Sequence, residues 1–361
     1  MPPPDARLMP RPDAPGALRT RPVGTASHGR ARRPPAAWLV AGVVALGVCV
    51  LASLAIGARP LAPGTLWDAW TGSDPANGDH AVALSRMPRT VVGLLVGASL
   101  GLAGAAMQGV TRNPLADPGI LGVNAGAAAG AVFAIGVLGL GSLGTQIWFA
   151  FAGAAIASVL VYAVAGLGRD GATPVTLALA GAGLSAGLTS LVTGVLIASQ
   201  ETLDAFRFWQ VGSLSGRSLD ALAPAVPFFA VAALVALLTG RVLNGLALGD
   251  DTARALGQRV GRSRLLVGLT VVVLCGAATS VAGPVAFLGL VVPHVARGLV
   301  GSDYRWVLPL SMVLAPALLL AADVLGRVVL PPAEVPAGVM TAVVGGPVFI
   351  WLVRHQRAVQ L

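Results

Sequence analysis

The sequence predicts an all-α membrane protein with about ten transmembrane helices. Hydrophobic residues make up 55% of its 361 residues and charged residues only 11%, whereas a soluble domain carries about 25% charge. The mean hydropathy is +0.80. An apolar stretch runs almost without interruption from Ala36 to Trp351. This length accommodates ten spans of about 20 residues joined by short loops.

The first 35 residues differ from the rest of the chain. They are rich in proline and arginine and show no apolar periodicity. A segment of this composition cannot bury enough apolar surface to fold. We therefore predict a disordered tail at residues 1–35, followed by a single transmembrane domain at residues 36–357.

Charged residues and prolines divide the first half of the apolar stretch into five spans. The first span follows the tail directly, and the fifth begins with a proline, which fits the first turn of a helix. In chain order the predicted spans are residues 36–57, 90–111, 119–139, 145–168 and 174–199, with Arg59, Arg112, Pro118, Arg169 and Pro174 at their boundaries.

The second half of the stretch divides in the same way. One boundary depends only on Gly283-Pro284, which interrupts a long apolar run, since proline breaks a helix interior. Treating that run as one bent helix would give nine spans instead of ten. The predicted spans are residues 221–243, 264–282, 285–300, 305–323 and 336–353.

Arginine placement determines the predicted topology. The chain has no lysine, so all 24 positive charges are arginines. With ten spans and the N-terminus inside, 18 of them fall on the cytoplasmic side and six outside, in accord with the positive-inside rule. Nine spans would move Arg354 and Arg357 outside, so we predict ten spans with both termini cytoplasmic. The net charge of +9 then reflects topology, and we expect no nucleic-acid partner.

Two glycine ladders flank a polar break between the second and third spans. Glycine recurs at every fourth position, about one helical turn, which leaves a groove for close approach of another helix. The break reads Arg112-Asn113-Pro114-Leu115-Ala116-Asp117-Pro118-Gly119. Since lipid tolerates broken backbone only where protein or water covers it, we predict closely packed spans beside a transport pathway. The ladders are Gly93, Gly97 and Gly101, then Gly122, Gly126 and Gly130.

The sequence lacks the motifs of the common catalytic sites. Without lysine it cannot carry a GxxxxGK[ST] phosphate-binding loop, and neither HExxH nor GxSxG occurs. Cys49 and Cys275 lack metal-ligand spacing, so we interpret both as small core residues. We predict that the chain is not an enzyme and uses no cofactor or metal. Energy for transport must then come from a partner.

An ion-coupled secondary transporter is the alternative from another class. Such carriers place ionisable groups in the middle of the membrane. Here the polar residues inside the predicted spans are neutral, and a neutral lining suits a large hydrophilic solute driven by an external energy source. These residues are Gln108, Asn124, Thr176, Ser185, Thr189 and Thr193.

The segment from Arg86 to Gly130 closely resembles the signature of FecCD-type permeases, subunits of ABC importers for ferric siderophores, haem and cobalamin. The resemblance continues to the C-terminus through Gly283–His294, Asp303-Tyr304-Arg305 and Ala333–Val339. Tyr304 replaces a histidine that is usual in the family, and Ala337 replaces a valine. The resemblance implies the type II importer fold. Two permease subunits would form the pathway in the bacterial cytoplasmic membrane. Lone His294 is interpreted as structural.

The resemblance also implies partners and the residues that contact them. In the family a cytoplasmic A-x-x-L-G element inserts into a cleft of the ABC ATPase, and Ala253, Leu256 and Gly257 match it. The acidic pair Asp250 and Asp251 favours the start of a short helix there, which continues through Arg254 within a predicted coupling loop at residues 245–264. A solvated inner loop is the simpler alternative.

On the outer side, the family's arginines contact acidic residues of a periplasmic or lipid-tethered substrate-binding protein. Arg86, Arg89 and Arg327 match these positions, so we expect them to form the docking site. Alternatively, they anchor helix ends at the membrane interface. The segment Phe206–Leu214 is expected to pack at the outer mouth, unless its aromatics form an interfacial belt.

The predicted pathway combines the hinge with the turn between spans four and five, where a cytoplasmic gate is expected. The sequence of the hinge is most similar to that of catecholate-siderophore permeases, so a ferric siderophore is the first expected solute. Cobalamin and haem stay open, as does the choice between a homodimer and a heterodimer of permeases. The pathway residues are Asn113, Pro114, Asp117, Pro118, Gly119, Asn124, Thr173 and Thr176.

Overall fold

Helices account for almost all of the structure, and no strand occurs among the described residues. It is a computed structural model that describes residues 34–57, 59–72, 74, 76–167, 173–331 and 333–359. Only the last two residues of the predicted tail at 1–35 fall within this part. Residues Pro34–Leu361 form one unit.

Seven helical segments in the described part are long and apolar enough to cross a membrane, and three further apolar helices are shorter. Together they confirm the prediction of about ten spans. The seven are α1 (Pro35–Ala55), α3 (Gly78–Thr111), α5 (Leu143–Gly166), α6 (Pro174–Ala198), the segment Leu219–Leu238 that ends in α9 (Val226–Leu238), α12 (Val260–Ala282) and α14 (Tyr304–Val329). The three are α4 (Val123–Val132) with its π turn Phe133–Val137, α13 (Leu288–Val300) and α15 (Ala337–Val359).

The apolar run around Gly283-Pro284 forms two helices. Gly283 ends α12 with a φ of 75° and a ψ of −178°, and Phe287 precedes α13 with a φ of 66°. A positive φ at each of these positions is incompatible with a continuous right-handed helix from α12 into α13. The alternative of one bent helix, and with it nine spans, is therefore wrong.

Helix α3 begins twelve residues earlier than predicted, at Gly78 instead of residue 90. The segment Gly78–Arg89 looked like a loop because it carries charges and Pro88. In the structure Asn77 caps the new start, since its side chain accepts a hydrogen bond from the Asp79 N–H at 3.0 Å. The extension carries Arg86 and Arg89 on a helix that continues into the core.

The first glycine ladder lies against α14. A Cβ on Gly97 would collide with the Pro316 Cα, and one on Gly101 would collide with the Ser311 carbonyl oxygen. One turn further along α3, Gly104 lies against the backbone of Gly289 in α13. Helix α3 is thus the central element, packed on α14, α12 and α13.

The second glycine ladder lies against α5. A Cβ on Gly126 would collide with the Gly153 carbonyl oxygen, and one on Gly130 would collide with the Phe149 carbonyl oxygen. The two ladders therefore face α14 and α5, whereas we expected them to pack spans two and three together. A small-residue face is suited to any closely approaching helix, so the pattern alone does not identify the partner.

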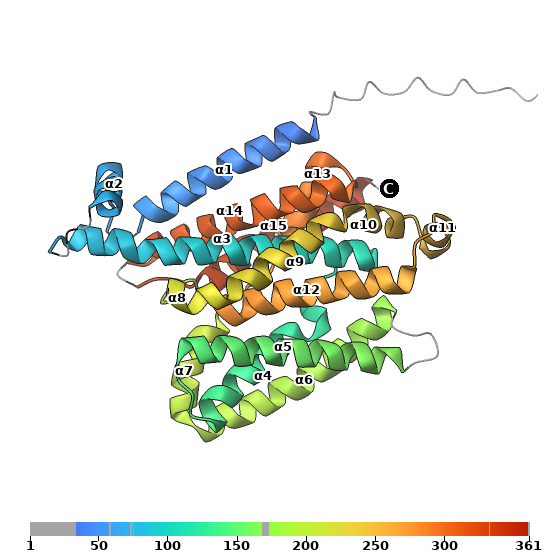
Figure 1. Cartoon of the computed structure of the whole chain (residues 1–361), viewed down its shortest axis with the longest axis horizontal. Coiled ribbons are helices and arrows are strands. Elements are labelled where there is room, and N and C mark those ends of the chain that lie inside the picture. Colours follow the sequence, from blue (N-terminus) through green and yellow to red (C-terminus); the bar gives the residue numbers. More distant parts are fainter. Residues whose placement is uncertain are drawn as a thin grey trace, which may run out of the picture. The chain divides into compact units, whose positions relative to one another are not determined.

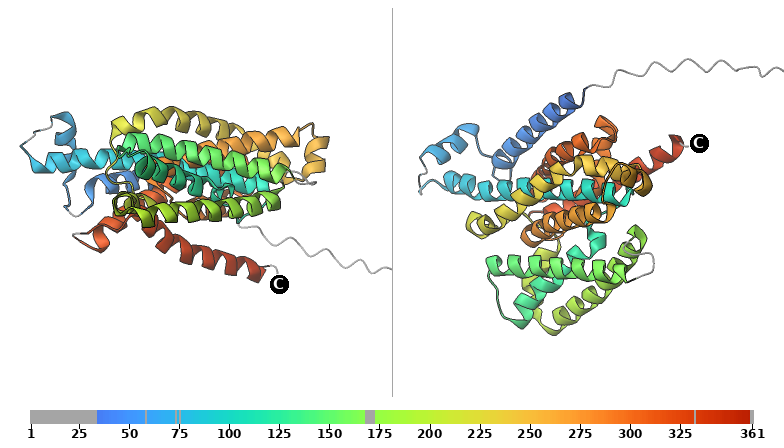
Figure 2. Two further views of the ribbon diagram at one scale, coloured as in Figure 1. Left: turned by 90° about the horizontal axis from the view of Figure 1, so that it is seen from below. Right: turned by 45° about the vertical axis from the view of Figure 1, so that its right-hand side comes forward.

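The helices share one principal direction, which fixes the two ends of the unit (Figures 1 and 2). The start of α1, the end of α15 and the short helix α11 (Asp250–Ala255) lie at one end. Helices α2 (Pro63–Thr71), α7 (Gln200–Gln210) and α8 (Leu219–Leu222) lie at the opposite end. We call these the α11 end and the α2 end; the predicted topology makes the first cytoplasmic and the second outer.

Candidate coupling, hinge and docking sites

The predicted coupling loop at residues 245–264 begins in the last turn of the short helix α10 (Gly240–Ala247) and contains α11. Gly249 precedes α11 with a φ of 102°, and Gly257 follows it with a φ of 80°. Both angles lie in the region that favours glycine. The Gly257 N–H donates to the Arg254 carbonyl at 2.9 Å, and the Gln258 N–H donates to the Ala253 carbonyl at 2.9 Å. These bonds close the end of α11.

The two faces of α11 differ sharply. Ala253 is fully buried in the main core cluster and fixes the helix to the unit. Leu256 is 64% exposed and points its apolar side chain outward at the end of the helix. Asp251, in the first turn of α11, is fully exposed and pairs with Arg254. The short helix therefore carries one exposed leucine at its end and exposed charged side chains along its length.

Polar contacts attach the coupling loop, and the helix α10 that leads into it, to the membrane helices. On α10, the Asn244 Nδ2 donates to Asp303 at 2.7 Å, and its Oδ1 accepts from the Tyr304 N–H at 2.8 Å. Hydrogen bonds from Arg305 also hold the pKa of the Asp303 carboxyl below its usual range. On α11, Asp250 forms ion pairs with Arg112 at 2.5 Å and Arg264 at 2.9 Å.

The predicted hinge is a series of side-chain-capped turns. Arg112 ends α3 in the left-handed conformation, with a φ of 53°. The Asn113 Oδ1 then accepts from the Leu115 N–H at 2.9 Å, and Asp117 caps the 3₁₀ turn η1 (Pro118–Leu121) by accepting from the Gly119 N–H at 2.7 Å. Burial raises the pKa of the Asp117 carboxyl, and this hydrogen bond opposes the effect.

Other predicted pathway residues lie near the hinge without forming one surface. Asn113 and Pro114 are exposed, and Pro118 is buried. Asn124 in α4 accepts a hydrogen bond from Thr279 in α12 at 3.0 Å. Helix α6 lies against the hinge at Gly181, where a Cβ would collide with the Ile120 carbonyl oxygen.

The predicted gate lies at the start of α6. Thr173 and Thr176 form a capping box there, in which each side chain bonds the backbone N–H of the other. Residues 168–172 of the same turn are outside the described part. The role of both threonines in a gate stays a prediction.

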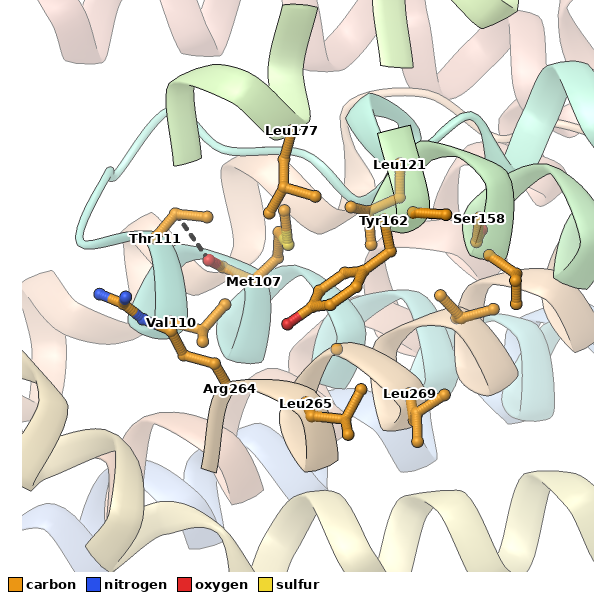
Figure 3. A pocket seen from close by; sticks show the side chains of 14 residues that line it. Met107, Val110, Thr111, Leu121, Ser158, Tyr162, Leu177, Arg264, Leu265 and Leu269 are labelled. Atoms are coloured by element: carbon orange, nitrogen blue, oxygen red, sulfur yellow. Dashed lines mark hydrogen bonds between the residues drawn. The ribbon is translucent and has the colours of Figure 1, made fainter. Parts of the chain in front are cut away.

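A mostly apolar cavity of about 300 Å³ lies beside the hinge (Figure 3). Residues from α3, η1, α5, α6 and α12 line it, including Met107, Leu121, Tyr162, Leu177 and Arg264. None of the predicted pathway residues is among the lining residues. The cavity is therefore distinct from the predicted pathway, although Arg264 connects it to the Asp250 ion pairs.

At the α2 end, two of the three predicted docking arginines are buried. Arg86 donates to the carbonyls of Leu54 and Ala55, each at 2.9 Å, and Arg327 donates to the Ser53 carbonyl at 2.7 Å. These oxygens belong to the last turn of α1, which lacks intrahelical partners. Arg327 is only 2% exposed. In the single chain, the guanidinium groups of Arg86 and Arg327 are thus bound to the end of α1, and their role in docking stays a prediction.

Asp323 is the acidic centre of this cluster. It is fully buried and forms ion pairs with Arg327 and with Arg89, the latter at 2.8 Å. Arg89 also contacts Glu334 at 2.6 Å and keeps 12% of its side chain exposed. Among the three predicted residues, Arg89 is the most exposed and has a partly exposed partner.

A polar cavity of about 340 Å³ opens beside this cluster. Its lining includes Arg59, Arg217 and Glu334, which no sequence pattern assigned to a site. The buried Nε of Arg217 has no hydrogen-bond partner among the described residues, and burial lowers the pKa of its guanidinium. The sequence Ser215-Gly216-Arg217 contains no recognisable motif. The only feature that distinguishes Arg217 in the sequence is its predicted location outside the membrane.

Two of the three aromatic rings in the predicted mouth segment are buried. Phe206 and Trp209 of α7 stack with ring centroids 5.2 Å apart, and both are shielded from solvent. The interfacial-belt alternative is therefore wrong for these two rings, whereas Phe208 is exposed. Behind them Gly212 lies against Pro284 and Gly338, a junction of three segments that only its glycines could have indicated.

Comparisons with known proteins agree with this fold. The model of the FecCD transport family matches residues 45–355 of this chain. The ferric enterobactin transport system permease protein FepD of Escherichia coli is 47% identical over 84% of this chain and 91% of its own length. The hemin transport system permease protein HmuU of Yersinia pestis is 36% identical, covering 87% and 94%.

A solved structure described as an inward-facing conformation of a metal-chelate type ABC transporter superimposes with a TM-score of 0.77. It is 28% identical and covers 88% of this chain and 98% of that one. The fold, the ten apolar segments and the family match agree along the chain. This multi-pass membrane protein belongs to the FecCD transport family.

Proposed function

We propose that this chain is the permease subunit of an ATP-driven importer that moves a ferric siderophore across the bacterial cytoplasmic membrane. The observation that carries the proposal is the identity of 47% to a permease named for ferric enterobactin, over nearly the full length of both chains. The solute would pass unchanged between two permease subunits. An ion-coupled secondary transporter is disfavoured, because the family match covers most of the chain.

A cytoplasmic ATPase supplies the energy in this proposal. The chain has no lysine and no phosphate-binding loop. Helix α11 supports the ATPase contact, since it is fixed by buried Ala253 and offers exposed Leu256. Arg254 and Gly257 flank that leucine in the sequence and complete the proposed contact.

A substrate-binding protein docks at the α2 end in this proposal. The polar cavity supports a refined docking site, because Arg59, Arg89 and Arg217 line it with partly accessible or unpaired guanidinium groups. Carboxylates of the binding protein would pair with them. Arg86 and Arg327 would then hold the frame of the site instead of contacting the partner.

A second permease subunit completes the pathway. Helix α6 supports this part of the proposal, because most of its apolar surface is exposed in the single chain. Leu179, Leu191 and Ile197 all face outward. The partner is either a second copy or a related permease.

Haem is the second candidate solute, since a relative with 36% identity is named for hemin. The test is uptake into proteoliposomes that contain the permease, its ATPase and its binding protein. We expect ATP-dependent uptake of a ferric catecholate and no ATP turnover by the permease alone. Uptake of haem or cobalamin in preference to the ferric siderophore would contradict the proposed solute, and uptake without the ATPase would contradict the mechanism.

A further inference from the structure

Three arginines from three helices surround one carboxylate at the α11 end. The Asp250 Oδ1 lies 2.5 Å from Arg112 and 2.9 Å from Arg264, and the Asp250 Oδ2 lies 4.0 Å from Arg254. We call these four side chains the Asp250 cluster. Arg112 ends α3, Arg264 lies near the start of α12, and Arg254 belongs to α11 itself.

Each arm of the Asp250 cluster leads to a different part of the unit. Arg112 is the residue at which α3 gives way to the hinge, and α3 is the central helix of the core. Arg264 borders the cavity beside that hinge and extends toward the last turn of α3, which carries Thr111 (Figure 3). Asp250 is the first residue of α11. The cluster thus joins the coupling helix to the end of α3, where the hinge begins, and to the start of α12.

The main arms of the cluster are only partly exposed. The side chain of Asp250 is 25% exposed, that of Arg264 is 23% exposed and that of Arg112 is 39% exposed. Partly buried charges attract one another more strongly than solvated ones, and salt screens them less. Among the described residues, Arg112 has no other ion pair and Arg264 pairs only with Asp250. One carboxylate therefore holds both cations.

We infer that Asp250 is a positioning residue that passes displacements of α11 to the α3–α4 hinge through Arg112. This inference rests on the proposed ATPase contact at Leu256. When the ATPase moves α11, the pair between Asp250 and Arg112 moves the end of α3 with it. Arg112 already holds a left-handed backbone, with a φ of 53°. Residues at the ends of helices are among those that absorb the backbone changes of hinge motions.

The neighbouring aspartate provides a matched control. Asp251 is fully exposed and forms an ion pair only with Arg254, at 2.8 Å, among the described residues. Asp250→Asn and Asp251→Asn remove the same charge from the same turn of the same helix. Only the first leaves Arg112 and Arg264 without an anion. An effect of net charge alone would appear equally in both variants.

The experiment uses the complete importer in lipid nanodiscs. For each variant we would measure copurification of the ATPase, ATP turnover with and without loaded binding protein, and solute imported per ATP. We expect Asp250→Asn to keep its ATPase but to lose solute imported per ATP by about tenfold, within the usual range of coupling between sites. Asp251→Asn should match the wild type, and Asp250→Glu should recover part of the loss.

A second variant tests the arm to the hinge. Arg112→Gln lies outside α11, so it leaves the ATPase contact intact, and it should reproduce the uncoupling. The double variant should be no worse than Asp250→Asn alone, because that variant already removes the pair with Arg112. Normal coupling in an assembled Asp250→Asn or Arg112→Gln importer would overturn the inference. If Asp250→Asn fails to assemble, Arg112→Gln alone decides. Leu256→Asp with an intact complex would instead overturn the ATPase contact.

Discussion

At the scale of single residues, the buried carboxylate of Asp323 has the greatest consequence for stability. It serves Arg89 and Arg327 together, and Arg327 in turn binds the end of α1. Removing one partner from a buried ion pair is strongly destabilising, because it leaves an uncompensated charge. The presence of the ion pair says less about stability than the cost of breaking it, because both ions lose their hydration when they are buried.

Asp323→Asn should therefore destabilise the protein by about 3–5 kcal/mol. Thermal unfolding in detergent would measure the loss. Glu334→Gln is the matched control, because Glu334 is 39% exposed and its ion pair is with Arg89. We expect that variant to unfold near the wild-type temperature. Equal unfolding temperatures for both variants would contradict the buried network.

The polar cavity at the α2 end leads to a prediction about association rates. Arg59→Glu combined with Arg217→Glu should slow binding of the substrate-binding protein and weaken its salt dependence, since charge complementarity acts mainly on the on-rate. Each exposed pair contributes only about 0–1 kcal/mol, so single alanine variants should change little. Stopped-flow binding at two salt concentrations would measure the rates.

Arg207→Glu serves as the control for this experiment. Arg207 lies on α7 at the same end, is exposed and pairs with Asp204 outside the cavity. If it slows association as much as the double variant does, general surface charge, and not the cavity, guides the partner.

At this scale, sequence patterns identified the charged residues but not their partners. Arg86, Arg89 and Arg327 stand out in an apolar chain because so few arginines are predicted outside. Their partners are the Ser53, Leu54 and Ala55 carbonyls and Asp323. A backbone carbonyl has no signature in the sequence, so burial of these arginines required the three-dimensional arrangement.

At the scale of helices, glycine faces determine how closely the elements approach. Gly97 touches the backbone of Pro316, and Gly126 touches that of Gly153. Backbone atoms cannot turn aside as the end of a long side chain can. A side chain added at either position forces the helices apart.

Gly97→Leu and Gly126→Leu should each cost about 1–3 kcal/mol or more. We expect lower yields of folded protein and lower transport in both variants. Gly47→Leu in α1 is the control, since a Cβ added there would meet no atom within 4 Å. Thermal unfolding and size-exclusion profiles would compare the three. Normal behaviour of Gly97→Leu would show that α3 and α14 are not in close contact.

The helices themselves were largely predictable, because apolar length and boundary charges follow directly from composition. The start of α3 was not predictable, since Pro88 and several charged residues are typical of a loop. The pairing of α3 with α14 was not predictable from the sequence either. It depends on Gly97 meeting Pro316 across more than half of the chain, and no local pattern records such a distance.

At the scale of the whole molecule, α11 is the proposed point where an external motor acts. Leu256→Asp should place an unpaired charge in the contact, which costs on the order of several kcal/mol. We expect the ATPase to dissociate during purification. Thr252→Asp is the control, because it adds the same charge to an exposed position on the same helix. Retention of the ATPase by the Leu256→Asp importer would remove α11 from the mechanism.

The number of spans followed from the arginine distribution, which reflects how the whole chain inserts. The common end shared by α1, α11 and α15 agrees with an even number of spans (Figure 1). The pathway could not be assigned in the same way. In the proposal the pathway lies between two permease subunits. The sequence of one subunit carries information about only one of the two surfaces that line it.

The attachment of α1 also has a consequence for biosynthesis. The carbonyls of Leu54 and Ala55 are satisfied by Arg86, which the ribosome adds about 30 residues later. The carbonyls of Ser53 and Ile56 depend on Arg327, more than 270 residues downstream. The first helix to emerge is thus secured by one of the last. Until α14 is synthesised, the carbonyls of Ser53 and Ile56 lack the partner that Arg327 provides, so the end of α1 gains its full attachment only late in synthesis.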